Sequence, residues 1–96
     1  MNPTTFKQIH QVMAFYNKPG IPYRRKQMQR LMSILDDIFT HEPYLGEQIH
    51  RVGRRQLIGY WERTKHEGQQ VRKEKYRILS LFFSRASPRV TVPKPK

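Results

Sequence analysis

The most regular stretch of the chain is QVRKEKYRILSLFFSRA, residues 70–86. Its apolar side chains recur at helical spacing, and at about 100° per residue they converge on one side. This apolar side consists of Val71, Ile78, Leu79, Phe82, Phe83 and Ala86. The opposite side carries Lys73, Arg77, Ser80 and Ser84. The pattern predicts a helix that buries one face in a core and turns a basic face outward.

Three earlier segments have the same period, which predicts helices over residues 5–17, 23–40 and 54–66. Thr5 is the expected N-cap of the first helix, and Gly68 is the expected stop signal of the third. The run KPGIP at residues 18–22 breaks the chain between the first two helices, and a loop is expected over residues 41–53.

No part of the chain shows the sustained alternation of a β-strand. The expected fold class is therefore all-α, a single four-helix bundle formed by residues 1–86. The third helix should bury Ile58 together with its core residues. The predicted core contains Leu31, Leu35, Leu57, Trp61, Ile78, Leu79 and Phe82.

The last ten residues, 87–96, carry three prolines and three basic side chains. Proline lacks the amide donor that a helix or a central strand needs, so this segment is expected to be an extended basic tail. Arg89, Lys94 and Lys96 should add to its affinity for an anion, and its removal is expected to leave the domain folded.

Charge is the most informative bulk property of the chain. Nineteen Lys and Arg face seven Asp and Glu, which gives a net charge of +12 on 96 residues. Such an excess repels itself in the compact state and is tolerated where a polyanion neutralises it. Strongly basic domains commonly bind nucleic acid, so a nucleic-acid partner is predicted.

Several other classes of protein fit the sequence poorly. The chain has no cysteine, no apolar run near the roughly 18 residues of a membrane span, and no apolar signal segment at its start, so a cytoplasmic location is expected. Its four histidines are scattered, its five glycines are isolated, and its serines lack a nucleophile-elbow context. We therefore expect no enzyme activity, metal, cofactor or small-molecule substrate.

Two helix faces suit a polyanion. Gln69 and Gln70 stand where the last helix begins, and a glutamine side chain can read an adenine edge in the major groove. Lys73 and Arg77 lie one turn apart and would extend that contact. In the second helix the basic residues occupy the first half and Asp36 and Asp37 the second, the reverse of what the helix dipole prefers. An ordinary solvated charged face is the alternative interpretation of both helices.

The segments QLIGYW (56–61) and EGQQVRKEKYRILSLFFSRA (67–86) resemble the core-binding domain of tyrosine recombinases and phage integrases. Those domains have a helix ending in a glycine, followed by a basic helix that closes on a Leu-x-x-Phe-Phe-like run. The resemblance covers about residues 20–86 and implies a SAM-like bundle that clamps duplex DNA. Two departures are the pair Gln69-Gln70, where the family has a Ser- or Thr-rich helix start, and the absence of the catalytic half of a recombinase from this chain.

The resemblance implies DNA contacts on two helices. It assigns them to Lys26, Gln29, Arg30, Gln70, Lys73 and Arg77, and the neighbouring Arg24, Arg25, Gln69 and Arg72 complete the predicted DNA-binding set. Charge reversal at Lys73 and Arg77 is expected to abolish binding, with Arg51 and Lys65 as a remote control pair.

The leading hypothesis is thus a non-catalytic double-stranded DNA-binding module linked to DNA integration or recombination in a phage or mobile element. A recombinase or another protein is a further expected partner. Two alternatives remain open: a basic protein that binds RNA or ribonucleoprotein, and an accessory factor or inhibitor of recombination that binds an acidic protein surface.

Overall fold

The computed structural model describes all 96 residues and contains four α-helices. They are α1 (Pro3–Val12), α2 (Pro22–His41), α3 (Arg54–Arg63) and α4 (Gln69–Ala86), with two short 3₁₀ turns, η1 (Pro43–Leu45) and η2 (Ile49–Arg51), between α2 and α3. The predicted all-α, four-helix fold is confirmed.

The start of α1 differs from the prediction. Asn2 is the N-cap, because its side-chain oxygen accepts a hydrogen bond of 2.8 Å from the amide of Thr5. Thr5, the predicted cap, lies inside the first turn, where it is buried and donates its hydroxyl to the carbonyl oxygen of Glu47. The helix also ends at Val12 rather than near Asn17, since the chain continues from Met13 in tight turns.

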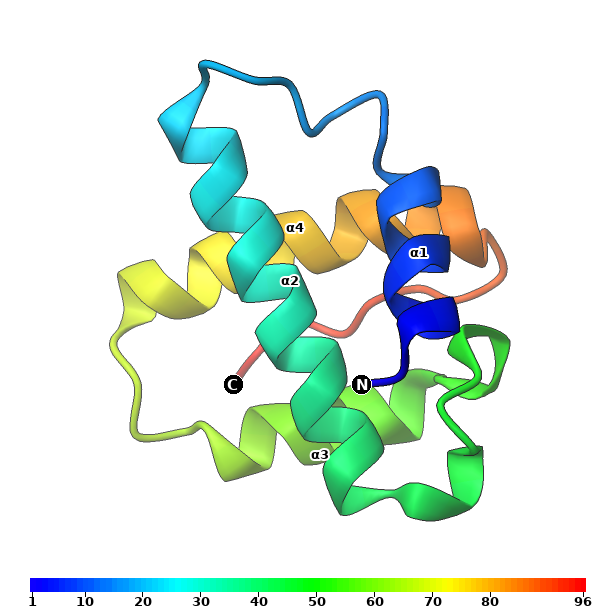
Figure 1. The fold of residues 1–96 in the computed structure, drawn as a ribbon. Coiled ribbons are helices and arrows are strands. Elements are labelled where there is room, and N and C mark those ends of the chain that lie inside the picture. Colours follow the sequence, from blue (N-terminus) through cyan, green and yellow to red (C-terminus); the bar gives the residue numbers. More distant parts are fainter.

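The long helix α2 organises the bundle. It crosses both α3 and α4, so that in Figure 1 it runs in front of them. Helix α1 packs beside the C-terminal end of α4, and the C-terminal segment (residues 87–96) runs between α3 and α4. Proline at the first position of α2 suits a helix start, because its missing amide hydrogen would have no partner there.

All seven predicted core residues are buried, each with at most 4% of its surface exposed. The structure corrects two other expectations, because Val71 is 37% exposed and Ile58 is 39% exposed. In the first turns of α4 the residues turned inward are instead Arg72 and Glu74. The interior of the bundle therefore contains charged groups that the apolar period does not reveal.

The C-terminal segment has no helix or strand, as expected, but it is packed against the bundle. Val92 is buried, and the indole N–H of Trp61 on α3 donates a 2.8 Å hydrogen bond to the carbonyl oxygen of Pro93. Arg72 on α4 donates to the carbonyl oxygens of Trp61 and Lys96. The segment is thus part of the packed structure and not a separate appendage.

Candidate nucleic-acid interface

Most of the positive charge has no internal counter-charge. Among the nineteen Lys and Arg side chains, three form ion pairs with carboxylates: Arg63 with Asp37 at 2.7 Å, Lys75 with Glu67 at 2.8 Å, and Arg77 with Glu74 at 3.1 Å. The carboxylates are largely occupied, since Asp36 pairs with the N-terminal ammonium group and Glu47 accepts from the amide of Asn2. The uncompensated charge therefore lies at the surface, where it attracts polyanions.

Part of this charge lines a depression that we call the basic groove. The groove has a volume of about 660 Å³ and lies between the start of α4, the loop before it and the C-terminal segment. Its exposed cations are Lys65, Lys73, Arg77, Lys94 and Lys96. Gln69, Arg72, Tyr76 and Pro95 also line it, and its one acidic side chain belongs to Glu67. Three separate parts of the chain thus direct basic side chains into one hollow.

Lys75 neutralises the carboxylate of the groove. Its ammonium group lies 2.8 and 2.9 Å from the two oxygens of Glu67 and 2.6 Å from the hydroxyl of Tyr60. Burial favours a lower pKa for Lys75, but the hydrogen bonds to Glu67 and Tyr60 outweigh it and raise the pKa above its ordinary value. Lys75 therefore stays protonated at neutral pH, and Glu67 does not offset the five exposed cations.

A second cluster, the Glu74 network, lies where α2 crosses α4. The carboxylate of Glu74 accepts hydrogen bonds from the hydroxyl of Tyr23 on α2 and, on α4, from Gln70 and Arg77, the latter two at 3.1 Å. Glu74 is 7% exposed, so these bonds satisfy a buried charge. The hydrogen bond to Glu74 also raises the pKa of Tyr23, because it stabilises the protonated phenol.

The network continues to Arg30. The amide of Gln27 donates to the backbone carbonyl oxygen of Glu74 at 3.0 Å, and Arg30 donates to the side-chain oxygen of Gln27 at 2.8 Å. This chain of bonds brings three predicted DNA-binding residues, Arg30, Gln70 and Arg77, to one crossing point. In the same network the side-chain amide of Gln70 donates its hydrogen bond to Glu74, within the protein.

The other predicted residues of α2 lie elsewhere. Arg24 is placed over the ring of Tyr16 at 5.0 Å and donates to the carbonyl oxygen of Tyr16. Arg25, Lys26 and Gln29 are exposed and line a smaller depression of about 340 Å³ beside the turn before α2. They do not line the basic groove, so the predicted residues other than Arg24 are divided between this depression, the Glu74 network and the groove.

Arg72 requires a correction. It was predicted to contact DNA, but it is 8% exposed, and its guanidinium group donates to the carbonyl oxygens of Trp61 and Lys96. The group also lies 5.7 Å from the centre of the Trp61 ring. Both terminal nitrogens of this guanidinium are thus used within the protein, where they hold α3, α4 and the C-terminal segment together, although Arg72 also lines the basic groove.

The groove also contains residues that the sequence did not place there. Lys65 was expected to be remote from the binding face, yet it lines the groove with Lys73 and Arg77. Lys94 and Lys96 were expected to contribute from a tail, whereas the structure makes them part of the groove wall. No local spacing in the sequence signals these positions, because the C-terminal segment returns from the far end of α4 to the loop that precedes this helix.

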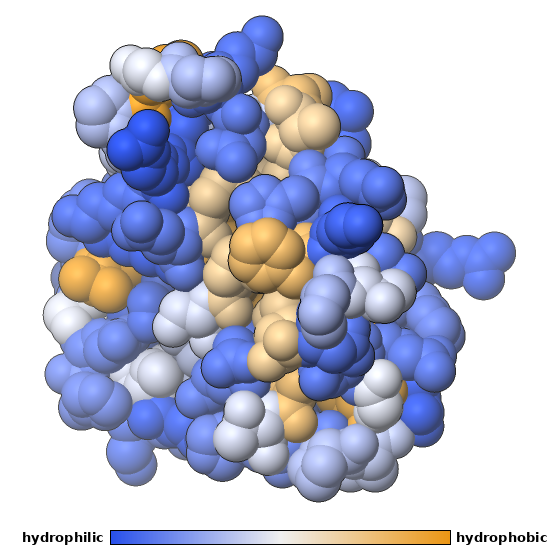
Figure 2. Space-filling view, viewed as in Figure 1, coloured by the Kyte–Doolittle hydropathy of each residue, from blue (hydrophilic) through white to orange (hydrophobic).

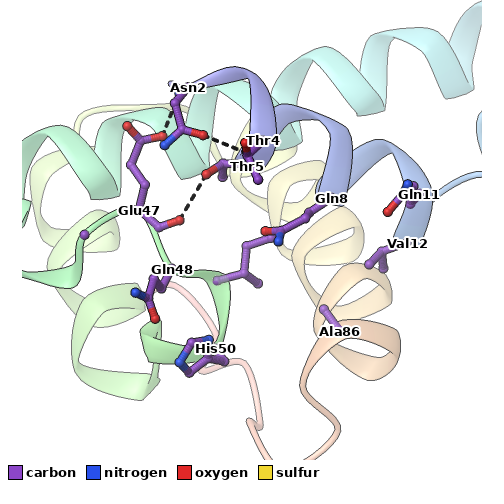
Figure 3. A pocket seen from close by; sticks show the side chains of 12 residues that line it. Asn2, Thr4, Thr5, Gln8, Gln11, Val12, Glu47, Gln48, His50 and Ala86 are labelled. Atoms are coloured by element: carbon purple, nitrogen blue, oxygen red, sulfur yellow. Dashed lines mark hydrogen bonds between the residues drawn. The ribbon is translucent and has the colours of Figure 1, made fainter.

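A different depression, shown in Figure 3, lacks this character. It has a volume of about 550 Å³ and lies between α1, the loop after η1 and the end of α4. Uncharged polar side chains such as Gln8, Gln11 and Gln48 line it. Its one carboxylate, on Glu47, accepts from the amide of Asn2 and belongs to a residue with a left-handed backbone (φ 54°). This hollow has no charge complementary to a polyanion.

The face seen in Figure 2 is mostly hydrophilic, with a narrow band of apolar atoms down its middle. Between α1 and α2 a depression of about 590 Å³ is lined by Phe6, which is 49% exposed, and by Met28 and Met32. Charged residues such as Lys18 and Arg25 share this lining.

Comparisons of the chain with protein-family models, with the sequences of curated proteins and with solved structures find no match. The resemblance to integrase core-binding domains therefore rests on the residues quoted for it. None of the helices has the length and apolar character required to span a bilayer.

Proposed function

We propose that the protein is a non-catalytic module that binds double-stranded DNA through the basic groove and the adjoining face of α4. The observation that carries the proposal is the groove itself. Five exposed cations from three parts of the chain line it, and Lys75 neutralises its single acidic side chain, Glu67. Lysine and arginine side chains bind phosphates and release their condensed counterions, which supplies affinity independent of base sequence.

Base contacts would come from the start of α4. Gln69 is exposed in the groove, and a glutamine can donate to and accept from an adenine edge. Lys73 and Arg77 follow on the same side of the helix and would hold the phosphates beside that base. This division of tasks, in which phosphate contacts position the protein and a base contact specifies the site, is common in DNA-binding proteins.

The proposal extends to DNA integration or recombination in a phage or mobile element, with a cytoplasmic, DNA-bound protein. It is supported by the resemblance of residues 56–61 and 67–86 to integrase core-binding domains. Arg72, which was added to the predicted set as a neighbour of those contacts, is buried, and the proposed surface adds the exposed Lys65, Lys94 and Lys96.

The experiment is a binding titration of the full chain with a labelled blunt-ended duplex at several salt concentrations. If about four phosphates are neutralised, log K should fall with a slope of roughly −3.6 against log salt. Binding should then weaken roughly a hundredfold between about 50 and about 200 mM salt. An affinity that does not change over this range would refute the proposal.

Competition separates the duplex from other partners. A double-stranded RNA and a single-stranded DNA of the same length should compete less well than the unlabelled duplex. Preference for the RNA would favour a role in a ribonucleoprotein. Retention of a protein partner after nuclease treatment, with no duplex binding, would favour an accessory protein that binds an acidic surface.

A further inference from the structure

The C-terminal segment is anchored at three points on either side of Lys94. Val92 is 7% exposed, the carbonyl oxygen of Pro93 accepts from Trp61 at 2.8 Å, and the carbonyl oxygen of Lys96 accepts from Arg72. Arg72 also donates to the carbonyl oxygen of Trp61 at 3.0 Å, so one guanidinium group joins α3, α4 and the segment. In Figure 1 the segment runs back between these two helices.

The anchors leave the lysine side chains free. Lys94 and Lys96 are exposed, and both line the basic groove with Lys73 and Arg77 of α4. They also line an adjoining depression of about 400 Å³ on the α3 side, with Arg54. The two lysines therefore lie between two hollows and supply the groove wall that faces α4.

The local sequence limits the freedom of this wall. Lys94 stands between Pro93 and Pro95, whose rings fix one backbone dihedral each. Proline has no backbone N–H to donate. The segment is therefore anchored at Pro93 through the carbonyl oxygen, which accepts a hydrogen bond from the indole N–H of Trp61. A basic group held in place before binding loses less conformational freedom on binding than the same group on a loose tail.

We propose that the C-terminal segment is a structural arm of the phosphate-binding site, held on Trp61 and Arg72 so that Lys94 and Lys96 oppose Lys73 and Arg77 across a phosphodiester backbone. The inference rests on the proposed function for its ligand and deepens it. It assigns Trp61 and Arg72 the role of positioning residues, which act through the lysines and do not touch the nucleic acid.

The test releases the arm without changing its charge. In the double variant Val92→Ser, Pro93→Gly every Lys and Arg is retained, while the buried side chain and one ring constraint are lost. Trp61 is the single tryptophan of the chain, so quenching of its fluorescence by acrylamide reports whether the arm has left it. The variant should show stronger quenching and a near-unchanged helical circular dichroism spectrum.

The readout is the salt slope of binding to the duplex. Lys94→Gln with Lys96→Gln should lower the magnitude of the slope by about two, close to one for each lost phosphate contact. Releasing the arm should lower it by a similar amount at constant net charge. Combining all four substitutions should lower it little further, because both changes remove the same contacts.

A matched control separates positioning from general loss of stability. Ile9→Ala removes a buried side chain of α1, which packs near the other end of α4, and should leave the slope unchanged. If the released arm keeps the full slope while the two glutamine substitutions reduce it, the lysines act as a loose tail and the inference is wrong. Should Val92→Ser, Pro93→Gly fail to fold, Trp61→Phe removes the hydrogen bond to Pro93 together with part of the ring that packs beside Arg72, and an unchanged slope in that variant also overturns the inference.

A second set of titrations uses single-stranded DNA. Binding to the single strand alone, with the same loss of slope on release, would refute the duplex proposal and support the positioning role. If the parent and the released variant bind the duplex with equal salt slopes, the duplex proposal is supported and the positioning role is refuted. If neither nucleic acid binds the parent chain, both proposals fall.

Discussion

The side-chain amide of Gln27 on α2 donates a 3.0 Å hydrogen bond to the backbone carbonyl oxygen of Glu74 on α4, and 1% of Gln27 is exposed. A polar side chain so deeply buried needs its partners, because an unsatisfied buried polar group is costly. Gln27 meets this requirement by also accepting a hydrogen bond from Arg30 at 2.8 Å. The crossing of α2 and α4 is therefore set by polar contacts as well as by apolar packing.

Gln27→Ala should destabilise the bundle by about 2 kcal/mol, because it removes both hydrogen bonds and leaves a small cavity. Unfolding by urea, followed by circular dichroism, gives the free energy of unfolding. The control is Gln29→Ala, an exposed position on the same helix, which should change stability by less than about 0.5 kcal/mol. Equal effects of the two variants would contradict a structural role for Gln27.

Phe82→Ala should remove a large part of the stability. Phe82 is fully buried and lies edge-on to Phe83 with ring centres 5.1 Å apart. Such truncations cost about 3–5 kcal/mol, against a total of about 5–15 kcal/mol for a typical domain. Phe6→Ala, at a half-exposed position of α1, should cost under about 1 kcal/mol and serves as the comparison in thermal unfolding.

Deleting residues 87–96 should lower the melting temperature and expose Trp61. The deletion removes the buried Val92, the hydrogen-bond acceptor of Trp61 and one acceptor of Arg72. Burial of the valine alone accounts for about 2 kcal/mol. Calorimetry and acrylamide quenching of Trp61 measure the two effects. A shortened chain with the parent's melting temperature and quenching would show that the segment is not packed in solution.

The bundle should lose stability above pH of about 10. Burial raises the pKa of Tyr60, and the hydrogen bond to Glu74 raises the pKa of Tyr23. A raised pKa means that the unfolded chain releases its proton at a lower pH than the folded protein does. The stability linked to these groups is therefore complete below the unfolded pKa and is lost as pH rises through the folded pKa.

Melting temperatures measured from about pH 8 to about pH 11 test this expectation. Alkali also relieves repulsion among lysines, which acts in the opposite direction, so variants are needed to isolate the tyrosines. Tyr60→Phe and Tyr23→Phe should each flatten the alkaline decline, while Tyr44→Phe, at a 60% exposed position, should not. An identical decline in all three variants would assign the effect to other groups.

The helices and the apolar core follow from local pattern. Leu79 and Phe82 lie at helical spacing on one face, and spacing alone places them inside. Gln27 and Glu74 could not be placed this way, because helical period assigns polar residues to the surface and only the crossing of two helices buries them. Propensity and period describe one element at a time, whereas such a crossing depends on two.

The candidate site was predictable only in part. Lys73 and Arg77 stand one turn apart on the outer side of α4, and their spacing opposite the apolar residues predicts this placement. Lys65 joins them from the loop before α4, and Lys94 joins them because the chain reverses after α4 and Trp61 holds Pro93 across 32 residues. Nothing in the spacing of the basic residues encodes that reversal. The same contact explains why Arg72, basic and near the start of a basic helix, is buried.

The last prediction locates the binding face by charge reversal at Lys65 and Lys73. Both are exposed in the basic groove, and neither forms an ion pair. Arg77 is a poorer choice, because a carboxylate at this position would face the buried Glu74, its present partner at 3.1 Å. Lys65→Glu with Lys73→Glu should therefore leave the melting temperature nearly unchanged, within the range of ordinary surface substitutions.

Duplex binding by this double variant should weaken by roughly fiftyfold or more at about 0.1 M salt, the effect of losing counterion release at two phosphates. The matched control is Lys7→Glu with Arg51→Glu, the same change of net charge at exposed positions of α1 and η2. Both elements border the depression at the C-terminal end of α4, whereas the groove lies at its start. Fluorescence anisotropy on one duplex at one salt concentration compares the two variants directly. If both weaken binding equally, the net charge of +12 draws the chain to DNA without a preferred face, and the groove is not the binding site.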